Sequence, residues 1–174
     1  MTTIEILDRV IASEGGFVDH PDDRGQATKY GITAATLGNW RGYARQATRA
    51  EVFALTLAEA RLIYEARYIE QPGFTPENIP DEPLRMALID EGVNAGPSVA
   101  IRHLQEALGV VVDGVLGPKT KAALLAHGEY RRLLLAVVRL RCLRYGRIVR
   151  GDPSQRAFIV GWLDRALDLL RVLA

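Results

Sequence analysis

Glu14 is the residue of this sequence whose position most favours chemistry. It follows Ile4, Leu7 and Ile11 at alternating spacings of three and four, which is one face of a helix. That face should turn Glu14 inward, where burial disfavours the ionised form of a carboxyl group. The negative end of the helix dipole acts in the same direction. We therefore expect an acid that stays protonated near neutral pH and can protonate a leaving oxygen.

A polar segment after Glu14 offers three candidates for a second carboxylate, Asp19, Asp22 and Asp23. Glycoside hydrolysis uses such a pair, one protonated acid and one ionised carboxylate. Thr28 follows with a hydroxyl group that can hold a water or orient a sugar. A surface glutamate at a helix end, followed by aspartates that form turns, would give the same pattern. The residue types alone leave both interpretations open.

Local signals predict the elements that must position these residues. Thr2 and Glu5 form a capping-box pattern that begins the first helix, and Gly15-Gly16 ends it. A long polar loop is then expected over residues 18–32. Trp40 lies on a short helix capped by Thr33, and core packing is its expected role.

Helical periodicity dominates the remainder of the chain. Thr48 with Glu51, and Thr56 with Glu59, are two more capping-box patterns. Further helices are expected after Pro83, over 99–108, 118–127 and 129–150, and after Ser154, the last with Trp162 in the core. Because strands and helices do not alternate, the sequence predicts a mainly helical single domain.

The composition excludes several classes of protein. The chain has 174 residues, a formal net charge of +1 and one cysteine, so its charge favours no particular partner and no disulfide joins two parts of it. The N-terminus lacks the pattern of a signal peptide, and no apolar run is long enough for membrane insertion. The histidines lack metal-ligand spacing with Cys142, so no metal and no cofactor are expected.

The exact string over residues 14–33, EGGFVDHPDDRGQATKYGIT, is more specific than its parts. It resembles the signature of glycoside hydrolase family 108, the N-acetylmuramidases of phage endolysins and related bacterial proteins. The resemblance continues through residues 90–96 (DEGVNAG), through DG-x-x-G-P-x-T at 113–120, and through 158–165 near the end of the chain. It therefore spans nearly the whole sequence.

This resemblance implies a lysozyme-like fold and cleavage between N-acetylmuramic acid and N-acetylglucosamine in peptidoglycan. Glu14 would be the catalytic acid and Thr28 would position a water. The second carboxylate would be Asp22 when counted back from Thr28, or Asp23 when counted forward from Glu14. Tyr30 and Gly31 would shape a sugar subsite. Gln26 departs from the family, which often has a glycine there.

Downstream residues extend the expected site. Asp90 and Asn94 lie one helical turn apart and could line the cleft and bind the N-acetyl group of a sugar, although Asn94 could equally be a helix cap. Glu91 is expected to be a buried partner for an arginine. By resemblance, residues 1–95 form a catalytic region, and residues 96–174 form a helical, peptidoglycan-binding-like region.

Two rival functions belong to other classes. The family resemblance includes secretion activators, so the chain could instead be a non-catalytic protein that binds peptidoglycan. The arginines of residues 129–150 could attract a polyanion, but no DNA-binding motif accompanies them, and we expect no nucleic-acid partner. A muramidase made in the cytoplasm without a signal peptide would act in the periplasm or on the cell wall after release by a holin or a secretion system.

Overall fold

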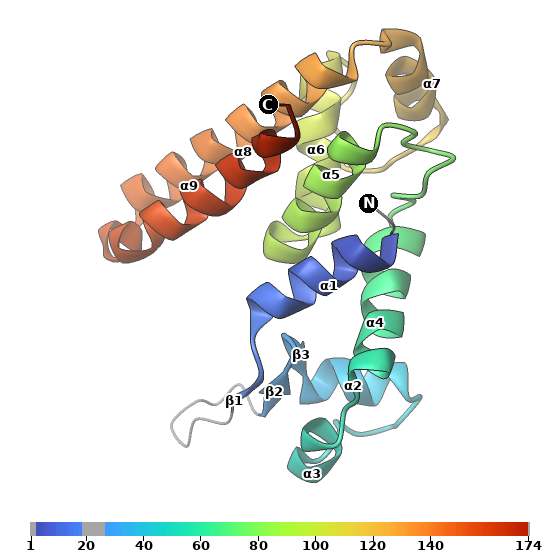
Figure 1. Cartoon of the computed structure of the whole chain (residues 1–174), viewed down its shortest axis with the longest axis vertical. Helices are drawn as coiled ribbons and strands as arrows, with labels where there is room; N and C mark the ends of the chain where they lie inside the picture. The colour runs from blue at the N-terminus through green and yellow to red at the C-terminus, as the bar shows by residue number, and fades with distance from the viewer. Residues whose placement is uncertain (1–2, 19–26, 174) are drawn as a thin grey trace. The chain divides into compact units, whose positions relative to one another are not determined.

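A computed structural model describes residues 3–18 and 27–173, and for Glu14 it describes the backbone but not the side chain. The chain forms two compact units, Met1–Arg67 and Tyr68–Ala174 (Figure 1). Helices dominate both units, so the expectation of a mainly helical fold is confirmed.

The first unit begins with α1 (Thr3–Glu14) and continues into a small sheet. Gly15 follows α1 with a φ of 84°, a value that glycine adopts easily, and it ends the helix as predicted. The antiparallel strands β1 (Phe17–Val18), β2 (Thr28–Lys29) and β3 (Ile32–Thr33) come next, in that order in the sheet. Predicting only a loop over 18–32 was therefore wrong, because strands of two residues are too short to show alternation.

Three threonines begin the next helices as the sequence predicted. Thr33 caps α2 (Ala34–Trp40), Thr48 caps α3 (Arg49–Phe53) in a full capping box, and Thr56 caps α4 (Leu57–Glu65). The capping-box pattern of Thr56 and Glu59 is only half formed, because only the Thr56 side chain makes its hydrogen bond. The Glu59 carboxylate accepts hydrogen bonds from Arg41 at 2.8 and 2.7 Å instead of returning to the cap.

The apolar face of α1 meets α4 in the core of the first unit. Several side chains there are at most 3% exposed: Leu7, Val10, Ile11, Leu37, Val52, Leu55 and Ile63. Trp40 was expected in this core, but it is 42% exposed. It is the last residue of α2, so the helix ends before a following turn can cover its ring.

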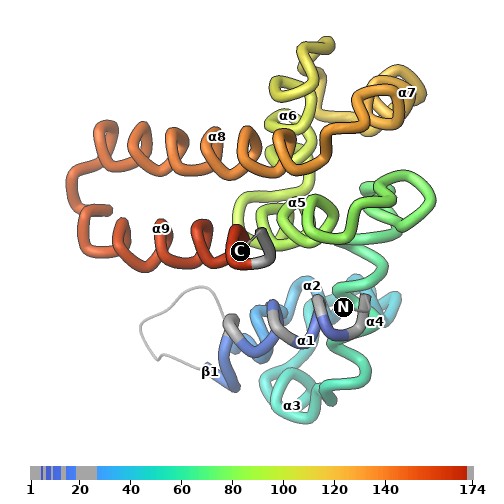
Figure 2. Tube along the Cα trace, turned by 45° about the horizontal axis from the view of Figure 1, so that its top comes forward, coloured from blue at the N-terminus to red at the C-terminus, as the bar shows by residue number. Residues whose placement is uncertain are grey.

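A π-helical turn, η1 (Ala66–Glu70), leads into the second unit. That unit contains α5 (Glu82–Ala95), α6 (Pro97–Leu108), α7 (Pro118–His127) and α8 (Tyr130–Gly151), followed by α9 (Ile159–Asp168) between the short 3-10 helices η2 (Pro153–Phe158) and η3 (Leu169–Leu173). Helix α5 packs on α6, both contact α8, and α8 runs back along α9 (Figure 2). The helices predicted for this part of the chain are present through α8, although α6 begins two residues earlier than predicted and α8 is shifted by one residue.

The turn between α8 and α9 differs from the prediction. Asp152, not Ser154, provides the cap, since its Oδ1 accepts a hydrogen bond from the Ser154 backbone N–H at 3.0 Å. The chain then makes the 3-10 turn η2 before α9 begins. Trp162 is consequently only partly buried, stacked between Tyr145 and Phe158 at ring distances of 5.3 and 5.9 Å.

Candidate active site

Glu14 is the last residue of α1, and the sequence predicted it at the end of this helix. Its side chain lies outside what the structure describes. Asp22 and Asp23 also lie outside the described residues. The assignment of Glu14 as the acid, and of Asp22 or Asp23 as the second carboxylate, therefore stays a prediction. The structure describes instead the elements that precede and follow this segment, α1 and the small sheet.

The β2–β3 hairpin positions three of the predicted site residues. Lys29 pairs with Ile32, so Tyr30 and Gly31 form a two-residue turn, and Thr28 lies on β2 directly before it. Tyr30 has a φ of 54° and Gly31 a φ of 70°. Positive φ at both central residues is what a type I′ hairpin turn requires.

Tyr30 is held in a conformation that bulky residues rarely adopt. The Tyr64 hydroxyl of α4 donates a hydrogen bond of 2.8 Å to the Tyr30 carbonyl, and Tyr64 is only 3% exposed. Strained backbone of this kind persists where surrounding structure over-determines it, and it gathers at functional sites. The bond from Tyr64 therefore stabilises the turn that presents Tyr30.

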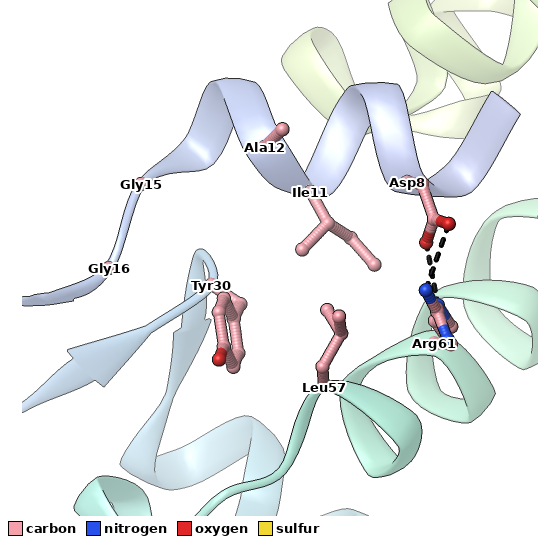
Figure 3. A pocket seen from close by; sticks show the side chains of 8 residues that line it. All are labelled: Asp8, Ile11, Ala12, Gly15, Gly16, Tyr30, Leu57 and Arg61. Atoms are coloured by element: carbon pink, nitrogen blue, oxygen red, sulfur yellow. Dashed lines mark hydrogen bonds and ion pairs between the residues drawn. The ribbon is translucent and has the colours of Figure 1, made fainter. Parts of the chain in front are cut away.

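Tyr30 faces a pocket of about 440 Å³ at the C-terminal end of α1 (Figure 3). Ile11 and Leu57 point toward one another across its floor, and the Tyr30 ring stands at one side. Gly15 and Gly16 pass along its edge, directly after Glu14. The full lining is Asp8, Ile11, Ala12, Gly15, Gly16, Tyr30, Leu57 and Arg61.

An arginine–carboxylate pair closes the other end of this pocket. Arg61 donates to the two carboxylate oxygens of Asp8 at 2.6 and 2.9 Å, in the fork geometry that favours bidentate recognition (Figure 3). The hydrogen bond to Asp8 raises the pKa of Arg61. Both side chains remain more than a third exposed, at 39% for Asp8 and 37% for Arg61. This end of the pocket is therefore polar and open to a ligand.

A second ion pair fixes α4, which carries Leu57, Arg61 and Tyr64. Arg41, just after α2, holds the Glu59 carboxylate at 2.7 Å. The hydrogen bond from Arg41 keeps the pKa of Glu59 below its ordinary value. The start of α4 is thus tied to the end of α2.

Asp90 and Asn94, the other predicted substrate-binding residues, belong to α5 of the second unit. Asp90 is 8% exposed and pairs with Arg141 of α8 at 2.6 Å and with Arg165 of α9 at 3.0 Å. Asn94 is exposed, and its Oδ1 accepts a hydrogen bond of 3.4 Å from the Tyr145 hydroxyl. Asp90 therefore joins three helices, while a role for either residue in substrate binding stays a prediction.

Glu91 is buried as expected, but its partner is not an arginine. His103 of α6 lies 2.7 Å away through its Nδ1, and the two side chains are 1% and 8% exposed. The neighbouring acid, Asp90, forms the ion pairs with arginines instead. Adjacent residues on a helix point about 100° apart, so the two acids meet different helices.

Hydrogen bonds with the Gln105 side chain of α6 hold together the loop with the DG-x-x-G-P-x-T pattern, residues 113–120. This fully buried side chain donates to Asp113 at 2.7 Å and to Thr120 at 3.1 Å, and it accepts from the Gly114 backbone N–H at 2.8 Å. Gly114 has a φ of 80°, and a Cβ there would meet the Ser98 hydroxyl at 2.4 Å. These residues hold the loop's shape.

Within residues 3–18 and 27–173, no three His, Cys, Asp or Glu side chains gather closely enough to hold a metal ion. Over the same ranges, none of the helices combines the length and the apolar character needed to cross a bilayer.

Sequence reasoning missed Asp8, Arg61 and Tyr64. Arg61 and Asp8 are 53 residues apart, and Tyr64 and Tyr30 are 34 apart, so no local spacing connects them. The one available signal was the position of Asp8 on α1, close in sequence to the predicted acid.

Comparisons with known proteins agree with the resemblance seen in the sequence. The profile described as glycosyl hydrolase 108 matches residues 7–96, and one described as a predicted peptidoglycan domain matches residues 99–167. The solved structure of Brucella abortus SagA is 33% identical, with a TM-score of 0.76, over 95% of this chain and 89% of that one. No curated protein matches. The division into functional regions 1–95 and 96–174 stays a prediction.

The lysozyme-like fold expected from the sequence is thereby confirmed. One family profile covers more than half of the chain, and a solved relative aligns along most of its length. The chain therefore belongs to the glycosyl hydrolase 108 family, a lysozyme-like family that acts on peptidoglycan, and it carries a peptidoglycan-binding domain after the family region.

Proposed function

We propose that this protein is a muramidase that hydrolyses the β-1,4 bond between N-acetylmuramic acid and N-acetylglucosamine. The observation that carries the proposal is the pocket at the end of α1, where Gly15 and Gly16 follow Glu14 and Tyr30 forms a wall. A volume of about 440 Å³ is within the range of small-ligand sites. A sugar bound there lies next to the backbone that carries Glu14.

In the proposed reaction, Glu14 protonates the glycosidic oxygen as the bond to the anomeric carbon breaks. Asp22 or Asp23 stabilises the positive charge that develops on the sugar, or activates the attacking water. Thr28 positions that water, and no cofactor takes part. Water supplies the hydroxyl group of the new reducing end, and its proton restores the acid.

Sugar recognition is proposed for the hairpin turn and the pocket. The Tyr30 ring presents an apolar face, which suits the apolar face of a pyranose. Gly31, at a φ of 70°, allows the turn without a side chain that would narrow the subsite. Asn94, whose side chain is exposed, is proposed as a further substrate contact, whereas the predicted contact at Asp90 is disfavoured because Arg141 and Arg165 hold its buried carboxylate.

The test is the release of new reducing ends from purified peptidoglycan by the wild type and by Glu14→Gln. Loss of a general acid should lower the rate by about a thousandfold. Glu65→Gln, the same change at an exposed position of α4, is the matched control and should cut like the wild type. If Glu14→Gln retains full activity while folded, Glu14 is not the catalytic acid.

A second candidate is a non-catalytic protein that binds peptidoglycan and assists secretion. The match of residues 99–167 to a predicted peptidoglycan domain favours it. Wild type and Glu14→Gln would then sediment with the wall equally well, and neither would release reducing sugar. In both cases the proposed place of action is the periplasm or the cell wall.

A further inference from the structure

The ion pair of Asp8 and Arg61 has no role in the proposed reaction, although both residues line the pocket at the C-terminal end of α1. The two side chains come from α1 and α4, and they meet at the end of the pocket opposite Gly15 and Gly16 (Figure 3). Asp8 is six residues before Glu14, which is about 9 Å along a helix. A sugar held beside the end of α1 would therefore meet this pair through a substituent of its ring.

The pair offers hydrogen-bond donors and acceptors together, with no net charge. A guanidinium group has five N–H donors, and the bonds from Arg61 to Asp8 use two of them. Each carboxylate oxygen of Asp8 accepts one of these bonds and has a second lone pair. Because the two side chains are 39% and 37% exposed, their attraction contributes little to stability. The fold therefore does not require two charged side chains in the wall of a pocket.

An apolar surface adjoins the pair on both helices. Asp8 and Ile11 are three residues apart on α1, and Leu57 and Arg61 are four apart on α4, so each helix places an apolar side chain beside its charged one. Ile11 and Leu57 point toward one another between the ion pair and the Tyr30 ring (Figure 3). Leu57 is 38% exposed. This end of the pocket thus combines an apolar floor with a neutral donor–acceptor pair.

An acetamido group has the chemistry that matches this arrangement. Its N–H is a donor that suits the Asp8 carboxylate, its carbonyl oxygen is an acceptor that suits the Arg61 guanidinium, and its methyl group suits an apolar floor. A hydroxyl group would leave that floor without a contact. An ammonium group would be repelled by Arg61, and a carboxylate by Asp8. The pair as a unit therefore favours a neutral amide over a charged group.

We propose that the Asp8–Arg61 pair, together with Ile11 and Leu57, binds the N-acetyl group of a sugar in the glycan strand. Asp8 accepts a hydrogen bond from the amide N–H, and Arg61 donates one to the amide carbonyl. This inference rests on the proposed muramidase function. It adds that the enzyme distinguishes N-acetylated glycan from glycan whose amino groups are free.

The experiment compares two substrates, N-deacetylated sacculi and the same material after its amino groups have been acetylated again. The wild type should prefer the acetylated form. Arg61→Met should lower kcat/KM on that form by about tenfold, the cost of one charge-assisted contact, and change it less than about twofold on the deacetylated form. Asp8→Asn, a change of charge without a change of size, should act in the same direction.

The matched control is Arg45→Met, which removes another exposed ion pair from the first unit. Arg45 donates to both carboxylate oxygens of Glu51 at 2.9 and 3.0 Å, and its side chain is 56% exposed. Neither residue lines the pocket at the end of α1. Arg45→Met should therefore keep the preference of the wild type for the acetylated substrate.

Equal losses on both substrates, or no loss on either, would overturn the N-acetyl site. If Arg61→Met does not fold, Asp8→Asn decides between these outcomes. If the wild type cuts neither substrate, the muramidase proposal fails, and the site is then tested by binding. The probe is N,N′-diacetylchitobiose, titrated against wild type and Arg61→Met by NMR. About tenfold weaker binding by the variant supports the site, and equal or absent binding contradicts it.

Discussion

The two units each contain an arginine–aspartate cluster, and the two clusters differ in their contact with water. In the first unit, the side chains of Asp8 and Arg61 are 39% and 37% exposed at the edge of the pocket. In the second, the side chains of Asp90 and Arg141 are 11% and 1% exposed. The same chemical pair is thus available to a ligand in one unit and sealed between helices in the other.

Solvation explains why the two clusters have different consequences. An exposed pair is screened by water, and its attraction is largely offset by lost hydration and side-chain freedom. A buried pair has already lost its hydration, so removal of one partner leaves a charge without compensation. Mutations of the first cluster should therefore change ligand binding, and mutations of the second should change stability.

Arg141→Met gives the largest expected effect on this comparison. It leaves Asp90 buried with only Arg165 and removes a donor to Tyr145, so the free energy of unfolding should fall by about 3 kcal/mol. Urea denaturation followed by circular dichroism measures it. Arg61→Met should barely move the unfolding midpoint but should weaken cleavage. If the two variants are equally destabilised, burial does not distinguish the clusters.

Gln105→Leu should have a smaller effect, again on stability. The Gly114 N–H and the Thr120 hydroxyl lose a buried partner, which should cost about 2 kcal/mol. Gln46→Leu, at an exposed position, is the control for the same change of side chain. An unchanged melting temperature for Gln105→Leu would mean that the loop of residues 113–120 keeps its shape without this network.

Tyr64→Phe should have the smallest effect and should act in the first unit. Loss of the bond to the Tyr30 carbonyl should cost about 1 kcal/mol of stability and reduce cleavage several-fold, because the strained turn loosens. Tyr130→Phe is the control. Full activity together with lower stability would show that Tyr64 supports the fold but does not position Tyr30.

The sequence by itself determined the local features of this protein. Thr33, Thr48 and Thr56 begin helices because a cap needs only a hydroxyl group and a backbone N–H a few residues away. The end of α1 at Gly15, one residue after Glu14, was also predictable from the sequence, because glycine adopts a positive φ easily. The family was predictable as well, because its motifs are short strings. Glu14, Asp22, Asp23 and Thr28 were named as candidates from helical spacing and residue chemistry, and the family string then gave them their expected roles.

Only the tertiary structure decided which distant side chains meet. Asp8 with Arg61 and Asp90 with Arg141 are separated by 53 and 51 residues, and nothing local selects one arginine among many. The same holds for the Tyr64 bond to Tyr30. Packing of the apolar helix faces brings these groups together, and it also decides whether water reaches a charge, since burial is a property of the folded chain.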